Sequence, residues 1–439
     1  MTGSPLDLPD ERRDALARLV GAWLAQRATE GRTAGGSGER GDRTGAAVPV
    51  PVPVADQEVT IVEVEVLRPG RPGLLDVIAE IDGRLAHAVL GLRRPGDEVH
   101  LLRSADQPVL GLLEDDHGLA LVVDALRDAG LAPLVLAAVT GEPAHPGPVV
   151  PLVDDQEVVS LAFADHCSLS VFPWLDPEPH RGVALLVALD EAGFNHLAAP
   201  LALWRRGGRD LGVVQEWLVG GSGAWALALT SLRDLYARGG APEEAGGDFG
   251  PEARTLGTMT ARMHLALDRA FGRRAVPVAG WVDDVHAAVP VVPDTVADML
   301  DGLRSADLRA SAIQTHGDFH LGRIARTDHG WVVADTTPGG VPPGSRQPVM
   351  RSPLADVADL LWSLHRAAAV AAADRDPADR ETVTALAEAW ESRNRRAFMA
   401  GYLATPGIGG LLPTNRDHLL ALVAAFELAR EARAAAMRA

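Results

Sequence analysis

Residues 314–337 read QTHGDFHLGRIARTDHGWVVADTT, and this stretch guides the interpretation of the whole chain. Its HGD tripeptide, which ends at Asp318, has the glycine and polar residues of a loop. The sequence that follows predicts a β-hairpin with its turn at residues 328–330, where Asp-His-Gly separates two apolar runs. The second strand, residues 331–334, ends directly before Asp335. The pattern therefore places two aspartates at neighbouring strand ends.

Two neighbouring carboxylates suit phosphoryl transfer, in which one orients the attacking hydroxyl and accepts its proton while the other holds Mg²⁺. Asp318 fits the first role and Asp335 the second. An HGD tripeptide alone is equally typical of a plain turn, so the indication comes from its combination with the hairpin. A metal-dependent hydrolase site at His316, Asp318 and His320 is an alternative, but it lacks the further histidines that such sites need. We therefore predict an ATP- and Mg²⁺-dependent kinase.

The flanking sequence is rich in predicted strands in its N-terminal half and in predicted helices in its C-terminal half. Alternating apolar residues at 59–67 and 74–91 predict a small sheet with one or two helices. A second strand-rich stretch, 152–220, contains a predicted hairpin at 158–175 and a helix at 181–193. Further helices are predicted at 8–27, 224–239, 253–271, 293–307, 353–373, 381–404 and 416–437. A mixed α/β part followed by a helical part is the layout of a two-lobed kinase, although other α+β proteins share it.

The charge composition limits the class of partner. The chain has 439 residues and a formal charge of −18, which argues against nucleic acid because binding to a phosphate backbone needs a basic surface. An acidic cleft would instead attract a cationic substrate. All 41 basic residues are arginines, so no lysine is available for binding phosphate. We therefore expect a small-molecule substrate.

Cysteine content and hydropathy indicate the compartment. Cys167 is the only cysteine, which excludes an internal disulfide and a cysteine-based zinc site. The N-terminal sequence lacks the apolar core of a signal peptide, and no apolar run reaches the roughly 20 residues of a membrane span. We therefore expect a cytoplasmic protein without a membrane partner, and we favour a monomer.

The motifs resemble those of a known family. HGDFHLGR (316–323), WVVAD (331–335) and RSPLADVADLLWSLHRAA (351–368) are similar to the catalytic stretch of actinobacterial maltokinases, which belong to the aminoglycoside-phosphotransferase group. The likeness covers roughly residues 150–435. GRPGLLDVIAEIDGRLAHAVLGL (70–92) also resembles the N-terminal cap of that family, with lower specificity.

The resemblance implies an α+β, two-lobed, protein-kinase-like fold with an N-terminal cap subdomain. Residues 1–150 would form the cap, with a mobile loop at 32–48. Residues 151–222 would form the part of the N-lobe that carries the nucleotide hinge, and 223–439 the helical C-lobe with the catalytic loop and sugar site. The lobes would close around the sugar and exclude water. The hinge, whose backbone would bind adenine, is implied to be Gln215, Glu216, Trp217 and Leu218, extending to Val219.

One residue near the metal position departs from the family's motif. Arg323 stands where the family has a metal-binding amide, five residues after Asp318. An arginine cannot ligate Mg²⁺ because it has no lone pair to offer, so Arg323 would contact phosphate instead. His320 is a candidate substitute ligand for the metal, with a buried structural histidine as the alternative.

The phosphate-binding residues of the family are also changed. Its lysine falls at Ser170, and the glutamate that would pair with that lysine falls near Ala184. Both halves of the ion pair are absent together, so neither charge is left uncompensated. The metal motif, 335–337, reads Asp-Thr-Thr and lacks a second carboxylate. Phosphate charge would have to be neutralised by Mg²⁺ together with arginines, or catalysis has been lost.

In the family the sugar lies between the catalytic loop and the C-terminal helices. Trp390-Glu391 and Phe426-Glu427, on consecutive predicted helices, match that pattern. An aromatic face with nearby carboxylates suits a sugar, although Trp390 is equally interpretable as a core residue at helical spacing. The residues implied to contact substrate are His316, Asp318, Asp356, Trp390, Glu391 and Glu427.

The maltokinase likeness is broken near the acceptor. Residues 336–348 read TTPGGVPPGSRQP, and Leu364-His365 stands where the family has an aromatic-rich pair. Asp356 and Asp359 share one helical face, a spacing usual on solvated faces; in a cleft they would favour a cationic amino sugar. The chain is thus more similar to the actinobacterial glucosamine kinase group, which implies transfer of the γ-phosphoryl group of ATP to the 6-hydroxyl of glucosamine. The alternatives are a maltokinase that forms maltose 1-phosphate, an aminoglycoside phosphotransferase, and a catalytically dead kinase-like binding protein.

Overall fold

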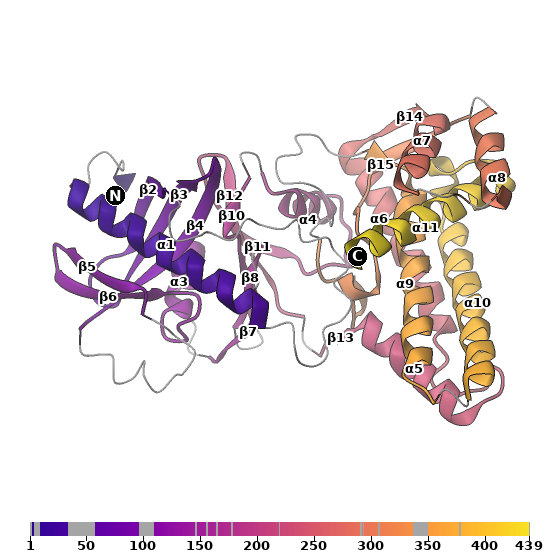
Figure 1. The fold of residues 1–439 in the computed structure, drawn as a ribbon, viewed down its shortest axis with the longest axis horizontal. Coiled ribbons are helices and arrows are strands. Elements are labelled where there is room, and N and C mark those ends of the chain that lie inside the picture. Colours follow the sequence, from indigo (N-terminus) through magenta and orange to yellow (C-terminus); the bar gives the residue numbers. More distant parts are fainter. Residues whose placement is uncertain are drawn as a thin grey trace. The chain divides into compact units, whose positions relative to one another are not determined.

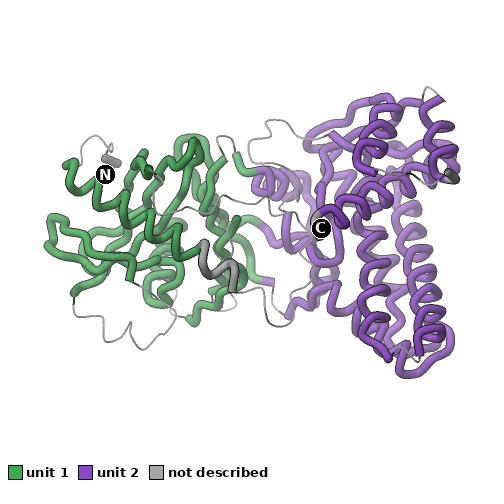
Figure 2. The backbone as a smooth tube through the Cα atoms, in the orientation of Figure 1, with its two compact units in different colours: residues 1–39, 48–180, 200–217 green, residues 40–47, 181–199, 218–439 purple. Residues whose placement is uncertain are grey.

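The structure is a computed structural model with two compact units, which Figure 2 shows in green and purple. It describes residues 2–3, 9–33, 58–95, 109–144, 147–154, 157–163, 166–176, 179–218, 220–289, 292, 294–305, 308–336, 350–376 and 379–438. Unit 1 comprises Met1–Glu39, Val48–His180 and Pro200–Trp217. Unit 2 comprises Arg40–Ala47, Arg181–Ala199 and Leu218–Ala439.

An antiparallel sheet and a long helix form the first part of unit 1 (Figure 1). The strand order is β1-β2-β3-β4-β6-β5, with β10 paired to β4. The strands are β1 (Thr2–Gly3), β2 (Thr60–Arg68), β3 (Gly73–Ile81), β4 (Arg84–Arg93), β5 (Gly111–Asp115), β6 (Gly118–Asp124) and β10 (Trp174–Leu175). Helix α1 (Asp10–Thr33) has its apolar residues at i, i+3 and i+4, a spacing that creates one apolar face. Leu16, Val20 and Trp23 on this face are buried in one core with the apolar side chains of β3 and β4.

A second antiparallel sheet completes unit 1, in the order β11-β12-β9-β8-β7. Its strands are β7 (Val149–Asp154), β8 (Val159–Phe163), β9 (Cys167–Val171), β11 (Pro200–Arg206) and β12 (Arg209–Glu216), and helix α3 (Ala132–Thr140) belongs to the same unit. The hairpin predicted at 158–175 is confirmed as β8 and β9, with Leu161 opposite Leu169. Its predicted second strand is too long, because β9 ends at Val171 and Trp174–Leu175 form β10, which pairs with β4. Strands β8 and β9 are short, apolar and bounded by polar residues, which is why their sequence alone revealed them.

Unit 2 is mostly helical. Its helices are α4 (Arg181–Glu191), α5 (Ala224–Arg238), α6 (Gly250–Phe271), α7 (Val278–Ala288), α8 (Asp294–Ser305), α9 (Pro353–Ala373), α10 (Arg380–Ala404) and α11 (Arg416–Arg438), with short 3-10 turns η3 (Leu321–Arg323) and η5 (Ile408–Leu411). Helix α9 packs against both α10 and α11 (Figure 1). Two small sheets complete the unit, in the orders β13-β16-β17 and β14-β15-β18. Their strands are β13 (Ser222–Gly223), β14 (Arg273–Pro277), β15 (Arg309–Gln314), β16 (Ile324–Thr327), β17 (Gly330–Val333) and β18 (Met350–Arg351).

Helices α6 and α10 cross at two glycines, where their backbones approach closely. A Cβ atom on Gly257 would lie 2.0 Å from the carbonyl oxygen of Phe398. A Cβ atom on Gly401 would lie 1.9 Å from the carbonyl oxygen of Arg254. Neither distance is compatible with a side chain, so the crossing requires glycine on both helices.

The predicted helices and the mixed fold class agree with the structure. The helices predicted at 224–239, 253–271, 353–373 and 381–404 correspond to α5, α6, α9 and α10. The division into cap, N-lobe and C-lobe stays a prediction. Residues 34–48 of the predicted mobile loop and residues 337–348 after the second aspartate lie outside the described residues. Among the described helices, none has the length and hydrophobicity needed to cross a membrane.

Candidate active site

The HGD loop connects β15 to η3 and the β16–β17 hairpin of unit 2. Gly317 has φ +89°, in the left-handed region that favours glycine, and it turns the chain so that Asp318 follows as a buried residue. The hairpin turn is confirmed by the pairing of Thr327 with Gly330. The second strand ends at Val333, two residues before Asp335. Both aspartates therefore occupy the loop and strand-end positions that the sequence predicted.

Asp318 is surrounded by cations. Arg323 donates from Nη2 to its Oδ2 over 2.9 Å, and Arg430 of α11 places Nη1 3.0 Å from its Oδ1. Burial by itself raises the pKa of a carboxyl, but the hydrogen bond from His320 and the two guanidinium charges outweigh it. Together they hold the pKa of Asp318 well below its usual range. The carboxylate is therefore ionised at neutral pH and able to accept a hydrogen bond from a hydroxyl.

Arg323 bridges the two aspartates. Its Nη2 group donates to Asp318, and its Nη1 group donates to Oδ2 of Asp335. The side chain of Arg323 is 13 % exposed, whereas that of Asp335 is 38 % exposed. One guanidinium group thus donates to both carboxylates and offsets one of their two negative charges, a contact that the sequence analysis did not foresee.

Asp356, in the first turn of α9, holds the HGD loop in place. Its Oδ2 accepts a hydrogen bond from the backbone N–H of His316 over 2.8 Å, and its Oδ1 accepts one from Gly317 over 2.9 Å. The ring of His264 on α6 lies 3.2 Å from the same Oδ2 atom and 2.8 Å from the hydroxyl of Tyr402. The structure gives Asp356 a positioning role, and its predicted contact with substrate stays a prediction.

Asp356 lies in the first turn of α9, and the sequence defines where this helix starts. The Ser352 hydroxyl caps the helix by accepting from the N–H of Leu354, and Pro353 occupies the first helical turn. About two helical turns further along, the hydroxyl of Ser363 accepts a hydrogen bond from the N–H of Leu321 in η3. Helix α9 therefore holds the HGD loop at His316 and Gly317 and the η3 turn that follows it.

His316 and His320 flank Asp318. The buried His316 ring donates from Nε2 to the carbonyl oxygen of Asp335 over 2.8 Å, and burial lowers its pKa, so the ring is neutral. Nδ1 of His320 accepts from the N–H of Gly322, and Nε2, which carries its proton toward the carboxylate, lies 3.4 Å from Oδ2 of Asp318. In this arrangement His320 has no lone pair left for the metal contact that the sequence suggested.

A second buried charge cluster lies behind Asp318. Asp359 of α9 faces Arg430 at 3.7 Å and Arg433 at 3.9 Å, and burial raises the pKa of Asp359 to about 7 despite these arginines. The Arg430 guanidinium lies 4.8 Å from the centre of the Trp362 ring. Asp356 and Asp359 are therefore both buried, not on a solvated face. Sequence reasoning missed Arg430, and the one local signal was its position on the apolar stripe of α11.

Trp390 is a core residue in the structure. Its side chain is 1 % exposed, its Nε1 donates to the hydroxyl of Ser231 over 2.9 Å, and its ring stacks on Phe249. The sequence analysis placed Trp390 beside the sugar, but no ring face is open to a ligand. The helical spacing of core residues and of site residues is the same, which is why the two interpretations could not be separated.

The two predicted acceptor glutamates are paired with basic residues. Arg395 donates to both oxygens of Glu427, over 2.6 and 2.8 Å, and lies 3.5 Å from Glu391. Nδ1 of His365 lies 2.9 Å from Oε2 of Glu391, and this hydrogen bond raises the pKa of His365. Both glutamates are only partly buried, so their contact with substrate stays a prediction.

The predicted nucleotide segment lies at the end of β12. Gln215 pairs with Ser168 of β9, β12 ends at Glu216, and Trp217 and Leu218 follow outside the strand. Val219 lies outside the described residues. At the position of the family's lysine, the Ser170 hydroxyl pairs with that of Ser160 on β8 over 2.7 Å. A neutral hydrogen bond replaces the charge, so this position cannot neutralise phosphate.

Two carboxylates, Asp318 and Asp335, are the candidate ligands for a metal ion. Carboxylate oxygens are the donors that Mg²⁺ prefers, usually one or two of them together with phosphates of the substrate. Within the described residues there is no group of three or more His, Cys, Asp or Glu that could form a cage. The donors therefore fit a metal that is delivered with a nucleotide.

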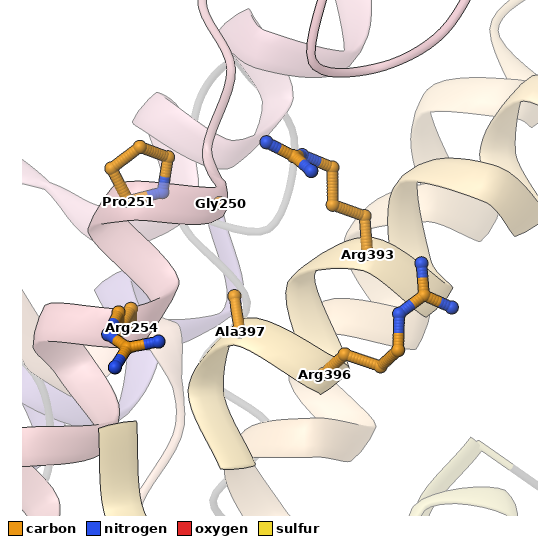
Figure 3. A pocket seen from close by; sticks show the side chains of 6 residues that line it. All are labelled: Gly250, Pro251, Arg254, Arg393, Arg396 and Ala397. Atoms are coloured by element: carbon orange, nitrogen blue, oxygen red, sulfur yellow. The ribbon is translucent and has the colours of Figure 1, made fainter. Parts of the chain in front are cut away.

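A pocket of about 460 Å³ lies at a different place in unit 2 (Figure 3). It is lined by Gly250, Pro251 and Arg254 of α6 and by Arg393, Arg396 and Ala397 of α10. The Arg393 guanidinium is held by the carboxylate of Asp248, over 2.9 and 2.6 Å. None of the residues that the sequence singled out lines this pocket.

The comparisons with known proteins agree with the kinase function that the site suggests. No family model matches the chain. A curated relative from Streptacidiphilus jiangxiensis, named glucosamine kinase, is 29 % identical over an alignment of 371 residues that covers 76 % of this chain and 81 % of the relative.

Solved structures of proteins with the same name as this relative are also similar to the chain. A glucosamine kinase in complex with glucosamine, ADP and inorganic phosphate has a TM-score of 0.61 and 22 % identity, and covers 89 % of this chain and 92 % of its own. Another solved structure, a glucosamine kinase in crystal form A, gives a TM-score of 0.60 with 23 % identity, over 86 % of this chain and 89 % of its own. The fold is that of the solved glucosamine kinases, and the resemblance to the glucosamine kinase group is confirmed.

Proposed function

We propose that this chain is an ATP-dependent glucosamine kinase that transfers the γ-phosphoryl group to the 6-hydroxyl of the sugar. The observation that carries the proposal is the pair of Asp318 and Asp335, held on a loop that Asp356 fixes from α9. The similarity to proteins named glucosamine kinase supports this acceptor over maltose or an aminoglycoside. A dead kinase-like protein would have no chemical need for both carboxylates.

Asp318 orients the attacking hydroxyl in this proposal. Its carboxylate is ionised and therefore accepts a hydrogen bond from the sugar hydroxyl. Its low pKa makes it a weak base, which suits a loose transition state in which the hydroxyl proton is transferred late. Asp356 and its partner His264 act through the loop backbone and keep Asp318 at the acceptor.

ATP would be bound as its Mg²⁺ complex. Asp335, the more exposed aspartate, would hold the metal together with Asp318, and a bound Mg²⁺ supplies charge neutralisation at the phosphates. The backbone of residues 215–218 would bind adenine. We extend the proposal to the two-lobed arrangement with an N-terminal cap, to the cytoplasm as compartment and to a monomeric protein.

A positively charged acceptor fits the composition of the chain. Glucosamine carries an ammonium group at neutral pH, and the protein has a formal charge of −18. Glu391 and Glu427 on the C-terminal helices are the predicted carboxylates for the sugar. The arginine and histidine that pair with them would have to share these carboxylates with the ligand.

The test is ADP release with ATP and Mg²⁺ against a panel of glucosamine, glucose, N-acetylglucosamine, maltose and one aminoglycoside. We expect a strong preference for glucosamine, and ³¹P NMR of the product should identify a 6-phosphate. Turnover of maltose alone, or equal turnover of maltose and glucosamine, would overturn the assigned acceptor. ATP binding without turnover of any sugar would favour the dead kinase-like protein.

A further inference from the structure

Arg323 occupies an unusual position for a positively charged residue in a phosphoryl-transfer site. Its backbone is fixed, because its N–H donates to the carbonyl oxygen of His320 and its own carbonyl accepts from Ala334, both over 2.9 Å. From this anchored position the guanidinium reaches Asp318 on one side and Asp335 on the other. The bridging contact is therefore built into the η3 turn and the start of the hairpin.

The contact of Arg323 with both aspartates reduces the repulsion between their carboxylates. Two carboxylates that face one shared position repel each other when both are ionised, and a cation between them removes the repulsion. In the proposed reaction that cation would be a divalent metal. Here the guanidinium stands between the same two carboxylates and supplies the positive charge itself.

Arg323 and a metal ion cannot occupy this position together. A guanidinium has no lone pair with which to share coordination, and it carries a positive charge that repels the metal. Arg323 is one of the groups packed on Asp318, whose side chain is only 1 % exposed. A ligand that needs Asp318 must therefore move the guanidinium first.

We propose that Arg323 is a built-in counter-cation that occupies the metal position between Asp318 and Asp335, so that a divalent ion binds there only by displacing it. The free protein then has little affinity for a divalent ion, and the metal enters with the nucleotide, whose phosphates offer Arg323 new acceptors. The role of the nucleotide rests on the proposed function. The competition between arginine and metal does not.

The experiment measures Mn²⁺ binding to the full chain without nucleotide or sugar, from the loss of the EPR signal of free Mn²⁺. We compare the wild type with Arg323→Gln, which removes the charge and keeps a polar side chain. Arg326→Gln is the matched control, because Arg326 is the next arginine along the same hairpin and forms its ion pair with Glu252 at 3.6 Å, while its Nη1 donates to the carbonyl oxygen of Thr327. The wild type and the control should bind Mn²⁺ with Kd values above about 1 mM, and Arg323→Gln should bind at least about tenfold more tightly.

Two further measurements keep the test decisive if Arg323→Gln is poorly folded. Arg323→Lys retains the charge and should bind Mn²⁺ as weakly as the wild type, which separates a charge effect from local disruption. The wild type alone can also overturn the proposal, by binding Mn²⁺ with a Kd well below about 0.1 mM in the absence of nucleotide. Equal Mn²⁺ affinity in the wild type and in a folded Arg323→Gln variant would overturn it too. Since no sugar or turnover is involved, failure of the kinase assay leaves this result intact.

Discussion

Arg430, on helix α11, places its Nη1 atom 3.0 Å from Oδ1 of Asp318 in the HGD loop. Arg430 is buried, so this ion pair is shielded from solvent, and its guanidinium also faces Asp359. The C-terminal helix thereby supplies a cation to a carboxylate more than a hundred residues earlier in the sequence. This contact makes α11 part of the proposed active site.

Removal of Arg430 should change both stability and pH dependence. Arg430→Gln leaves Asp318 with one guanidinium fewer, and loss of one partner of a buried ion pair costs about 3–5 kcal/mol of unfolding free energy. The pKa of Asp318 should rise, so the acidic limb of the kcat profile should move to higher pH. Urea unfolding and rate measurements across pH check both effects. Arg433→Gln is the control, since Arg433 is 49 % exposed; equal effects in the two variants would contradict the assigned role.

Asp356 should act on turnover more than on sugar binding. Asp356→Asn removes the charge that accepts hydrogen bonds from the loop N–H groups and faces His264, so the loop loses its fixed position. We expect kcat to fall by about 100-fold with a much smaller change in the KM for glucosamine. Steady-state kinetics measure the two constants separately. Asp374→Asn, at the exposed end of the same helix, should leave both unchanged, and a mainly KM-based defect in Asp356→Asn would assign it to the substrate instead.

Asp359 should make the protein less stable as pH rises. Burial raises its pKa to about 7, above the unfolded value of about 3.9, so between these values the folded protein binds more protons than the unfolded chain. The contribution of Asp359 to the unfolding free energy is therefore fully present below the unfolded pKa and is lost as the pH rises to about 7. Asp359→Asn has no carboxyl group to ionise at this position, so it does not lose stability in this way. The difference in unfolding free energy between the variant and the wild type should therefore move in favour of the variant by up to about 4 kcal/mol between about pH 4 and pH 8.

Thermal unfolding of both proteins across this pH range measures the gain. Asp301→Asn, at an exposed position of α8, should show the pH dependence of the wild type. A constant difference between Asp359→Asn and the wild type at all pH values would show that Asp359 is ionised throughout, contrary to this account.

The glycine crossing of α6 and α10 should be sensitive to one methyl group. In Gly401→Ala the new Cβ atom would lie 1.9 Å from the Arg254 carbonyl oxygen, so the helices must separate, at a cost of about 1–3 kcal/mol or more. Gly280→Ala in α7 meets no atom within 4 Å and should stabilise by up to about 1 kcal/mol through helix propensity. Denaturant unfolding of the two variants should give opposite signs. A destabilised Gly280→Ala with an unchanged Gly401→Ala would contradict the crossing.

Local patterns in the sequence predicted much of this fold. Apolar periodicity located α5, α6, α9 and α10, because each helix buries one continuous face. The Asp-His-Gly turn and the glycine of the HGD loop located the hairpin and the two aspartates. These features depend on residues close together in the chain, which a single sequence displays directly.

Contacts between distant segments could not be predicted in the same way. Arg430 reaches the HGD loop from α11, and His264 reaches Asp356 from α6, and neither carries a local motif. Arg430 lies seven residues after Val423 on the buried face of α11, and a charge at such a position requires a partner. That spacing indicates burial but not which carboxylate is the partner. Trp390 illustrates the reverse case, because an aromatic residue on the inner face of a helix serves a core or a site equally well.

The most direct test of the account is glucosamine-dependent ADP release by the wild type and by Asp318→Asn, with Asp328→Asn in the exposed hairpin turn as control. We predict turnover by the wild type and the control at closely similar rates. Asp318→Asn, checked for folding by circular dichroism, should be slower by about 1,000-fold, because it lacks the carboxylate that orients the hydroxyl. An Asp318→Asn rate within about tenfold of the wild type would show that the phosphoryl transfer does not depend on this carboxylate.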